Sequence, residues 1–190
     1  LARGQTLAAL RSNGLQLHSG PPEAPVVQAH RVRASGDPHD IGPQDLVVVA
    51  VKAPAMRDVA LLVAPLLRPD TVVLTAMNGV PWWFLQGFGG ALQGTRLQAV
   101  DPTGEITAAV PAASILGGVV HASCAVVQPG VVRHGFGNRI IVGEPSGRRS
   151  ERITALGELL TRGGFDAPVT AQIQREIWFK LWGNLTMNPV

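Results

Sequence analysis

Two short runs of apolar, mostly β-branched residues constrain the fold of this chain more than any other feature. The first spans residues 45–51 and ends at Lys52, and the second spans residues 71–75 and is followed by Asn78. Such runs are typical of strands that are buried on both faces of a parallel sheet. Between them, apolar residues recur at helical spacing after Pro54, which suits the first turn of a helix. The pattern therefore predicts a βαβ unit with a right-handed crossover.

The rest of the chain alternates between helical and extended patterns, which indicates a mixed α/β fold. Ser150 is a suitable N-cap for one helix, which Gly163-Gly164 ends, and Gly14 closes another. The further elements that we predict are a helix over 5–13, extended segments over 15–33, a turn over 101–104 between 97–100 and 105–110, strands over 117–127, 130–134 and 139–142, a helix over 151–161, a short strand over 165–169 and a last helix that opens at Ala171.

Lys52 and Asn78 follow the two strands of the βαβ unit. Ligands of open α/β sheets bind outside the carboxyl ends of the strands, so we expect both side chains near one ligand-binding edge. A lysine there can meet phosphate or ribose oxygens, and an asparagine offers both a donor and an acceptor. The alternative is that Lys52 is a solvated strand end and that Asn78 belongs to an ordinary turn.

The last helix carries three polar residues four positions apart, Lys180, Asn184 and Asn188. At this spacing they share one helical face. A lysine that is partly removed from water has a lowered pKa, which suits a proton donor near neutral pH. The alternative is a polar stripe that faces solvent. The apolar residues of this helix that we expect to point elsewhere and to pack are Trp178, Leu181, Trp182 and Leu185.

Composition excludes several classes of protein. The single cysteine, Cys124, rules out an internal disulfide and a cysteine-rich zinc site. No apolar run is suited to span a bilayer, and no signal peptide is visible, so a cytoplasmic protein without a membrane partner is expected. The formal net charge of +3 is scattered, with no aromatic residues interleaved in its densest cluster at residues 148–152, which argues against nucleic-acid binding.

Arg3 follows what reads as a strand end and precedes Gly4. A guanidinium group at this place can bind a ribose 2′-phosphate, which favours NADP over NAD; the alternative is a surface arginine. The sequence contains no glycine-rich G-x-G-x-x-G motif.

Taken together, these segments resemble the ketopantoate reductase (2-dehydropantoate 2-reductase) family, in the family's order and over nearly the whole chain. The most specific piece is Trp178-Phe179-Lys180-Leu181-Trp182-Gly183-Asn184 with the following Asn188-Pro189. The other matching pieces are Leu1-Ala2-Arg3-Gly4, Val51-Lys52-Ala53, Met77-Asn78-Gly79-Val80, residues 117–122, and residues 129–134 leading to 141–144.

The resemblance implies a Rossmann-type NADP-binding domain over residues 1–169 and the start of an all-helical substrate and dimerisation domain over 170–190. It also implies an NADPH-dependent reduction of 2-dehydropantoate to pantoate, and a homodimer formed through the helical domain. The roles that it implies are a general acid for Lys180, substrate binding for Lys180, Asn184 and Asn188, and cofactor binding for Arg3, Lys52, Asn78 and Ser123.

The chain also departs from the family pattern. The first strand with its glycine-rich loop would precede Leu1, and most of the helical domain, with a serine and a glutamate of the family's site, would follow Val190. We therefore interpret the chain as the middle of a longer protein and expect no turnover from residues 1–190 alone. Alternatives are a reductase of another 2-keto acid, a β-hydroxyacid or opine-type dehydrogenase, and an NADP-binding module without catalysis.

Overall fold

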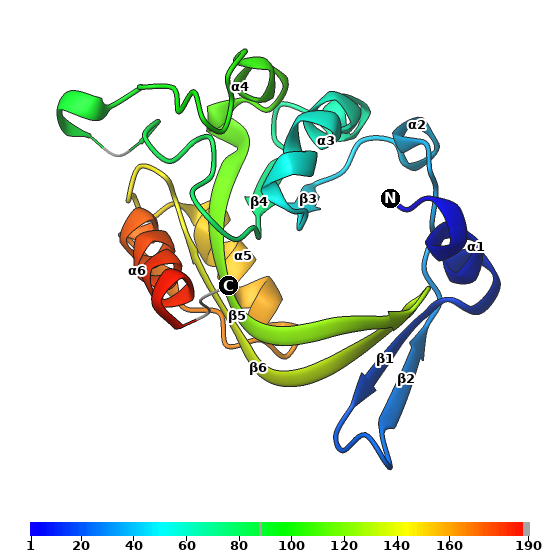
Figure 1. Ribbon diagram of the computed structural model, residues 1–190. Coiled ribbons are helices and arrows are strands. Elements are labelled where there is room, and N and C mark those ends of the chain that lie inside the picture. Colours follow the sequence, from blue (N-terminus) through cyan, green and yellow to red (C-terminus); the bar gives the residue numbers. More distant parts are fainter. Residues whose placement is uncertain (88, 188–190) are drawn as a thin grey trace. The chain divides into compact units, whose positions relative to one another are not determined.

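The computed structural model describes residues 1–87 and 89–187, which form two compact units (Figure 1). The first unit comprises Leu1–Gly42 and His121–Asn138, and the second comprises Pro43–Val120 and Arg139–Val190. The two long strands β5 (Ile115–Gln128) and β6 (Val131–Gly143) each contribute residues to both units. The fold is mixed α/β, as predicted.

The first unit contains four elements of its own. They are α1 (Gly4–Asn13), β1 (Leu15–Ser19), β2 (Val26–His30) and α2 (Pro38–Ile41). Strand β1 pairs antiparallel with β2 and parallel with β6. Helix α1 ends at Gly14, which has φ +73° and donates its N–H to the carbonyl of Leu10 at 3.1 Å. The predicted helix and extended segments of this region are confirmed.

The second unit contains the predicted βαβ unit. Strands β3 (Leu46–Val49) and β4 (Val72–Thr75) are parallel, and β4 is also parallel to β5. Between β3 and β4 lie α3 (Met56–Val63) and the short 3-10 helices η1 (Ala53–Ala55) and η2 (Ala64–Leu66). The remaining elements are η3 (Gly90–Leu92), α4 (Glu105–Ala109), η4 (Ala112–Ser114), α5 (Glu151–Arg162), β7 (Val169–Thr170) and α6 (Ile173–Met187).

Several predicted boundaries need correction. The strand expected over 165–169 is reduced to β7, and α6 begins at Ile173 and not at Ala171. Val48, in the middle of β3, is 53% exposed, so this strand is not buried on both faces. The compact units also do not coincide with the expected boundary after residue 169, and the assignment of 170–190 to a separate helical domain stays a prediction.

Helix α5 covers one side of the strands of the second unit. Ser150 caps it by accepting the N–H of Ile153, as predicted. Burial of each large apolar side chain stabilises the fold by about 1.5–3 kcal/mol. The buried cluster consists of Leu74, Leu116, Ile140, Val142, Ile153 and Leu156.

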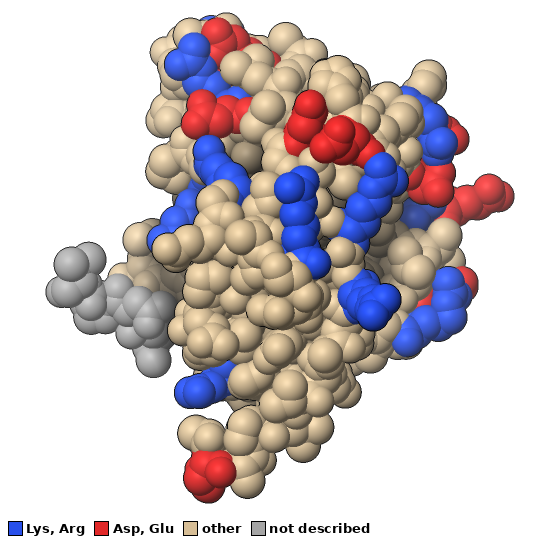
Figure 2. Space-filling view, turned by 90° about the vertical axis from the view of Figure 1, so that its right-hand side faces the viewer, with Lys and Arg blue, Asp and Glu red and all other residues tan. Residues whose placement is uncertain are grey.

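Among the described residues, four arginines of the second unit form ion pairs with carboxylates, and three of them lie in exposed pairs. Arg57 pairs with Glu105, Arg139 pairs with Asp166, and Arg68 pairs with Asp45 and Asp70. Figure 2 shows basic and acidic side chains interspersed with neutral surface on the face that it draws. The expectation that the chain does not bind nucleic acid stays a prediction.

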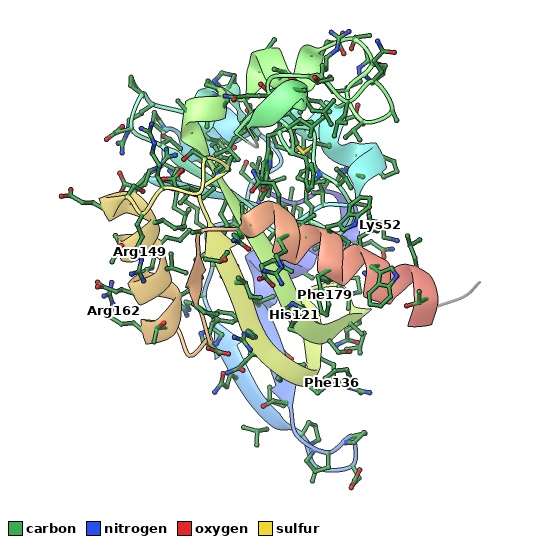
Figure 3. The ribbon with its side chains drawn as sticks, turned by 90° about the vertical axis from the view of Figure 1, so that its left-hand side faces the viewer. Lys52, His121, Phe136, Arg149, Arg162 and Phe179 are labelled. Carbon is green, nitrogen blue, oxygen red and sulfur yellow. The ribbon has the colours of Figure 1, made fainter. Side chains whose placement is uncertain are left out.

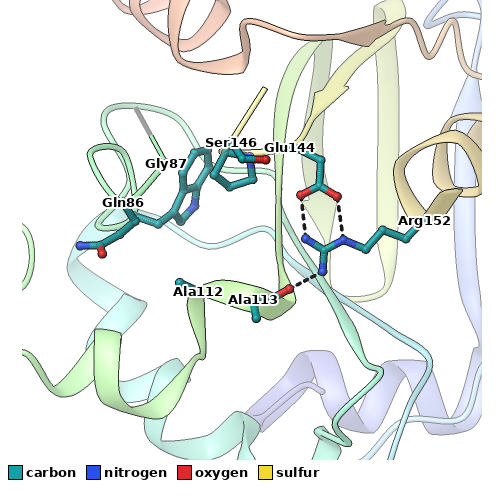
Figure 4. Close-up of a pocket in the computed structure, with 9 residues that line it drawn as sticks. Gln86, Gly87, Ala112, Ala113, Glu144, Ser146 and Arg152 are labelled. Atoms are coloured by element: carbon teal, nitrogen blue, oxygen red, sulfur yellow. Dashed lines mark hydrogen bonds and ion pairs between the residues drawn. The ribbon is translucent and has the colours of Figure 1, made fainter. Parts of the chain in front are cut away.

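In one ion pair the carboxylate is almost removed from water. Glu144, 5% exposed, accepts bonds from Arg152 Nε at 2.7 Å and Nη2 at 2.6 Å (Figure 4), and it also accepts one from Ser150 Oγ at 2.6 Å. Arg152 also donates to the carbonyl of Ala113. Burial acts to raise the pKa of Glu144, but these hydrogen bonds and the charge of Arg152 outweigh it, so the pKa lies below its ordinary value. The pair thus ties the end of β6 to the start of α5 and to the residues before β5.

We expect Glu144→Gln to lower the free energy of unfolding at pH 7 by about 1.5–3 kcal/mol, because it leaves Arg152 without its counter-charge. A carboxylate with a lowered pKa in the folded state stabilises the protein above its unfolded-state pKa. The difference between wild type and variant should therefore shrink as the pH falls from the ordinary value of 4.5 through the lower folded-state pKa.

Denaturant melts of both proteins between pH 7 and pH 3 measure this difference. Glu105→Gln is the matched control, because it removes a carboxylate from the exposed pair with Arg57 and should change stability much less. A Glu144→Gln effect that stays constant down to pH 3 would contradict the assignment.

Candidate active site

Strands β3, β4 and β5 are paired in parallel. Val49 lies beside Thr75, and Thr75 lies beside Gly117. Lys52, Asn78 and Val120 each follow one of these paired residues by three positions in the sequence. The expectation that Lys52 and Asn78 follow neighbouring strands at one edge is therefore consistent with the observed pairing, and both side chains are exposed.

Helix α6 presents one stripe of side chains to the sheet. Ile173 and Ile177 are buried, at 0% and 6% exposure, and Lys180 and Asn184 follow at helical spacing and are partly buried. Figure 3 shows α6 crossing β5, with Phe179 on the helix and Lys52 nearby in the view. Lys180 therefore continues the apolar stripe that faces the sheet.

The ammonium group of Lys180 bonds to two of the strand segments at once. Its Nζ donates to Asn78 Oδ1 at 2.8 Å and to the carbonyl oxygen of Val120. These contacts join residues that are far apart in the sequence, and all three lie in the second compact unit. The structure thus brings together Lys180 and Asn78, which the sequence had singled out for separate reasons.

Burial lowers the pKa of Lys180 from its ordinary value of 10.5, because removal from water disfavours the charged form. An ammonium group has three N–H donors, and two of them meet acceptors among the described residues. A third N–H can then be offered to an oxygen atom of a ligand. A held ammonium with a lowered pKa is suited to transfer a proton to a developing alkoxide.

The other predicted site residues are placed as follows. Asn184 lies one turn beyond Lys180 on α6 and is partly buried, whereas Asn188 lies outside the described residues. Arg3 and Ser123 belong to the first unit, and both are exposed. Arg3 precedes α1 as its N-cap residue, with extended backbone and no capping bond from its side chain.

Three of the four other apolar side chains of α6 pack only in part or not at all, although the ring of Trp178 lies 6.5 Å from that of Phe84 and the ring of Trp182 lies 6.2 Å from that of Phe179. Trp178, Trp182 and Leu185 are 60%, 62% and 71% exposed, and Leu181 alone is partly buried. The physical reason is that α6 is apolar on more than one side, while only the stripe with Ile173 and Ile177 meets the sheet.

Sequence reasoning missed the acceptor on Val120 and the cavity beside the Glu144–Arg152 pair. A backbone carbonyl carries no signal in residue identity, and only the register of β4 and β5 could have indicated it. The cavity has a volume of about 220 Å³, and it is lined by Trp83, Gln86, Gly87, Ala112, Ala113, Glu144, Pro145, Ser146 and Arg152 (Figure 4). None of the predicted site residues lines it.

The part of the chain that the structure describes supports neither a metal site nor a membrane-spanning helix. Residues 1–87 and 89–187 hold no group of three or more histidine, cysteine, aspartate or glutamate side chains that could bind a metal ion. Within the same residues, no helix combines the length and the hydropathy needed to cross a membrane.

Comparison with known proteins gives consistent matches. A family model described as ketopantoate reductase PanE/ApbA matches residues 1–82. A 2-dehydropantoate 2-reductase from Mesorhizobium japonicum is 45% identical over 190 residues, which are 100% of this chain and 57% of that protein. The chain thus spans little more than half the length of this relative.

Two solved structures resemble the whole chain. A protein described as a ketopantoate reductase from Ralstonia solanacearum is 53% identical with a TM-score of 0.93, over 100% of this chain and 57% of that one. A 2-dehydropantoate 2-reductase from Geobacter metallireducens is 29% identical with a TM-score of 0.76, over 99% and 55% of the two chains. By these matches, the chain is similar over its whole length to part of the longer ketopantoate reductases.

Proposed function

We propose that this chain is part of an NADPH-dependent reductase that converts 2-dehydropantoate to pantoate, with Lys180 as its general acid. The observation that carries this proposal is the half-buried Lys180 ammonium, held by Asn78 and the carbonyl of Val120 at the carboxyl ends of parallel strands. This is the edge at which α/β sheets bind their ligands. The curated relative at 45% identity bears the name of this activity.

The residues of the second unit divide the work of the reaction. The chemistry that NADPH supplies when bound is transfer of a hydride to the 2-keto carbon. Lys180 donates its free N–H to the carbonyl oxygen, stabilises the negative charge that grows there, and transfers the proton to give the hydroxyl group. Asn78 holds the ammonium in place and offers its amide N–H₂ to a neighbouring ligand group. Asn184, and Asn188 by the resemblance, orient the substrate.

The residues present are chemically suited to a phosphorylated dinucleotide. Lys52 and Asn78 are exposed at the strand ends, where an ammonium and an amide can bind ribose or phosphate oxygens. Arg3 is exposed and extended before α1, and by the resemblance it binds the 2′-phosphate, while Ser123 contributes a backbone contact. By the same resemblance, a first strand with a glycine-rich loop and a larger helical domain complete the enzyme, and the helical domain forms a homodimer.

Experiments can distinguish two alternative functions from the proposed one. The segment 81–111, which contains Trp82 and Trp83, is longer than in a minimal family member. The first alternative is therefore a reductase whose substrate is another 2-keto acid. A panel of 2-keto acids, assayed by NADPH oxidation, identifies the substrate by the largest kcat/KM. A module that binds NADPH and turns over none of them would be the non-catalytic alternative.

We expect Lys180→Ala to lower kcat of the complete reductase by about 10²–10⁴-fold, the usual contribution of a general acid. Affinity for NADPH should change little. The alkaline limb of the kcat profile should disappear, because it reports deprotonation of this ammonium. In the wild type that limb should lie below pH 10.5, since burial lowers the pKa of Lys180.

Steady-state kinetics across pH, with a thermal melt of each variant, measure these effects. Arg175→Ala is the control, because it removes a positive charge from the exposed side of the same helix. A Lys180→Ala variant with near wild-type kcat and an intact alkaline limb would end the assignment.

We expect Arg3→Ala to weaken NADPH binding by about 1.5–3 kcal/mol, the contribution of a charge-assisted hydrogen bond, and to leave NADH binding nearly unchanged. Fluorescence titration of both cofactors measures the difference. Arg11→Ala, on the helix that Arg3 precedes, is the control, because the Arg11 guanidinium donates to the carbonyl of Ala34. Equal losses of NADPH and NADH affinity in Arg3→Ala would remove Arg3 from the phosphate-binding role.

A further inference from the structure

The start of α6 packs against two glycines. Ile173, the first residue of the helix, is fully buried. A Cβ atom added to Gly117 on β5 would lie 2.6 Å from Ile173 Cγ1 and 2.7 Å from Trp83 Cη2. A Cβ atom added to Gly143 on β6 would lie 2.7 Å from the carbonyl oxygen of Thr170 and 2.9 Å from Ile173 Cβ. Since real Cβ atoms do not approach neighbours so closely, the two glycines form a seat that admits Ile173 only because they lack side chains.

Two further contacts fix this seat. The indole Nε1 of Trp83 donates to Thr75 Oγ1 at 3.0 Å, inside the core at the end of β4. Gln174, which is 6% exposed, donates its side-chain N–H to the carbonyl of Pro145 at 2.6 Å. The first turn of α6 is therefore held both by close packing and by a partly buried hydrogen bond.

One glycine of the seat and the anchor of Trp83 lie on the strands that lead to the acceptors of Lys180. Gly117 precedes Val120 by three residues on β5, and Thr75, which anchors Trp83, precedes Asn78 by three residues. Along α6, Lys180 follows Ile173 by seven residues, which is about two helical turns. A shift of the first turn is therefore carried by the rigid helix to the ammonium group.

We propose that Gly117 and Gly143 are positioning residues, whose seat for Ile173 sets α6 at the depth and register that bring Lys180 to Asn78 and Val120. As a statement about catalysis, this proposal rests on the proposed function, in which Lys180 is the proton donor. The two glycines touch no reacting atom and act through the helix.

NMR of the complete reductase labelled with [¹³C]lysine measures the placement of Lys180. The signal of Lys180 is the one that Lys180→Arg removes, and Lys52 is the only other lysine within residues 1–190. In Gly117→Ala, displacement of α6 should expose Lys180 to water, so its pKa should rise toward the ordinary lysine value. In the complete reductase the same variant should lose about 10²-fold in kcat, the effect of a misplacement of roughly 1 Å, with little change in NADPH affinity.

Gly118→Ala is the matched control for a loss of stability without movement of α6. Its added Cβ would meet Leu74 Cδ1 at 3.0 Å and the carbonyl oxygen of Thr75 at 3.3 Å, whereas the Cβ at Gly117 meets Ile173. Neighbouring residues of a strand point to opposite faces. We expect Gly118→Ala to lower the melting temperature and to leave the Lys180 titration at its wild-type position.

If Gly117→Ala does not fold, Ile173→Ala tests the same seat by removing the side chain that fills it. We expect the Lys180 pKa to rise in this variant too. An unchanged Lys180 titration in folded Gly117→Ala or Ile173→Ala, or an equal shift in Gly118→Ala, would overturn the proposal. A shifted titration combined with full kcat in Lys180→Ala would support the seat and contradict the proton-donor role, so the two failures are distinguishable.

Discussion

The half-buried ammonium of Lys180 is the group on which the arrangement of the second unit depends. Removing a charged amine from water is costly unless acceptors replace the lost hydration. Here the replacements are Asn78 Oδ1 and the carbonyl of Val120, and both come from strand segments and not from the helix that carries the lysine. The site therefore exists only when β4, β5 and α6 are packed in one register.

That register has identifiable physical causes. The parallel pairing places Val49, Thr75 and Gly117 side by side, three residues before Lys52, Asn78 and Val120, and the buried cluster between the strands and α5 fixes the sheet. The glycines at 117 and 143 let α6 approach closely enough for a side chain to reach across. The Glu144–Arg152 pair holds the end of β6 to the start of α5 and to the residues before β5. Packing, charge pairing and close backbone approach thus all help to fix the strands and α6 in the arrangement that brings Lys180 to its two acceptors.

Much of this could be predicted from the sequence, for physical reasons. The apolar runs at 45–51 and 71–75 have the period and length of buried strands, and they indicated the βαβ unit and the location of Lys52 and Asn78. The spacing of Lys180 and Asn184 gave a shared helical face. The hydrogen bonds of Lys180 to Asn78 and to the carbonyl of Val120 could not be predicted. They depend on how α6 crosses the sheet and on a backbone carbonyl that no residue type identifies. The exposure of Trp178 and Trp182 was missed for a similar reason, since an apolar pattern does not say which side of a helix is covered.

The central claim is that the Lys180 amine itself delivers the proton. Chemical rescue tests this most directly: the complete Lys180→Ala reductase is assayed in the presence of small primary ammonium ions of different pKa. The account predicts that kcat rises with the concentration of the added ammonium ion, and that the rate depends on its pKa as expected for general acid catalysis. A rate that no primary amine restores, in a variant that still folds and binds NADPH, would contradict the claim.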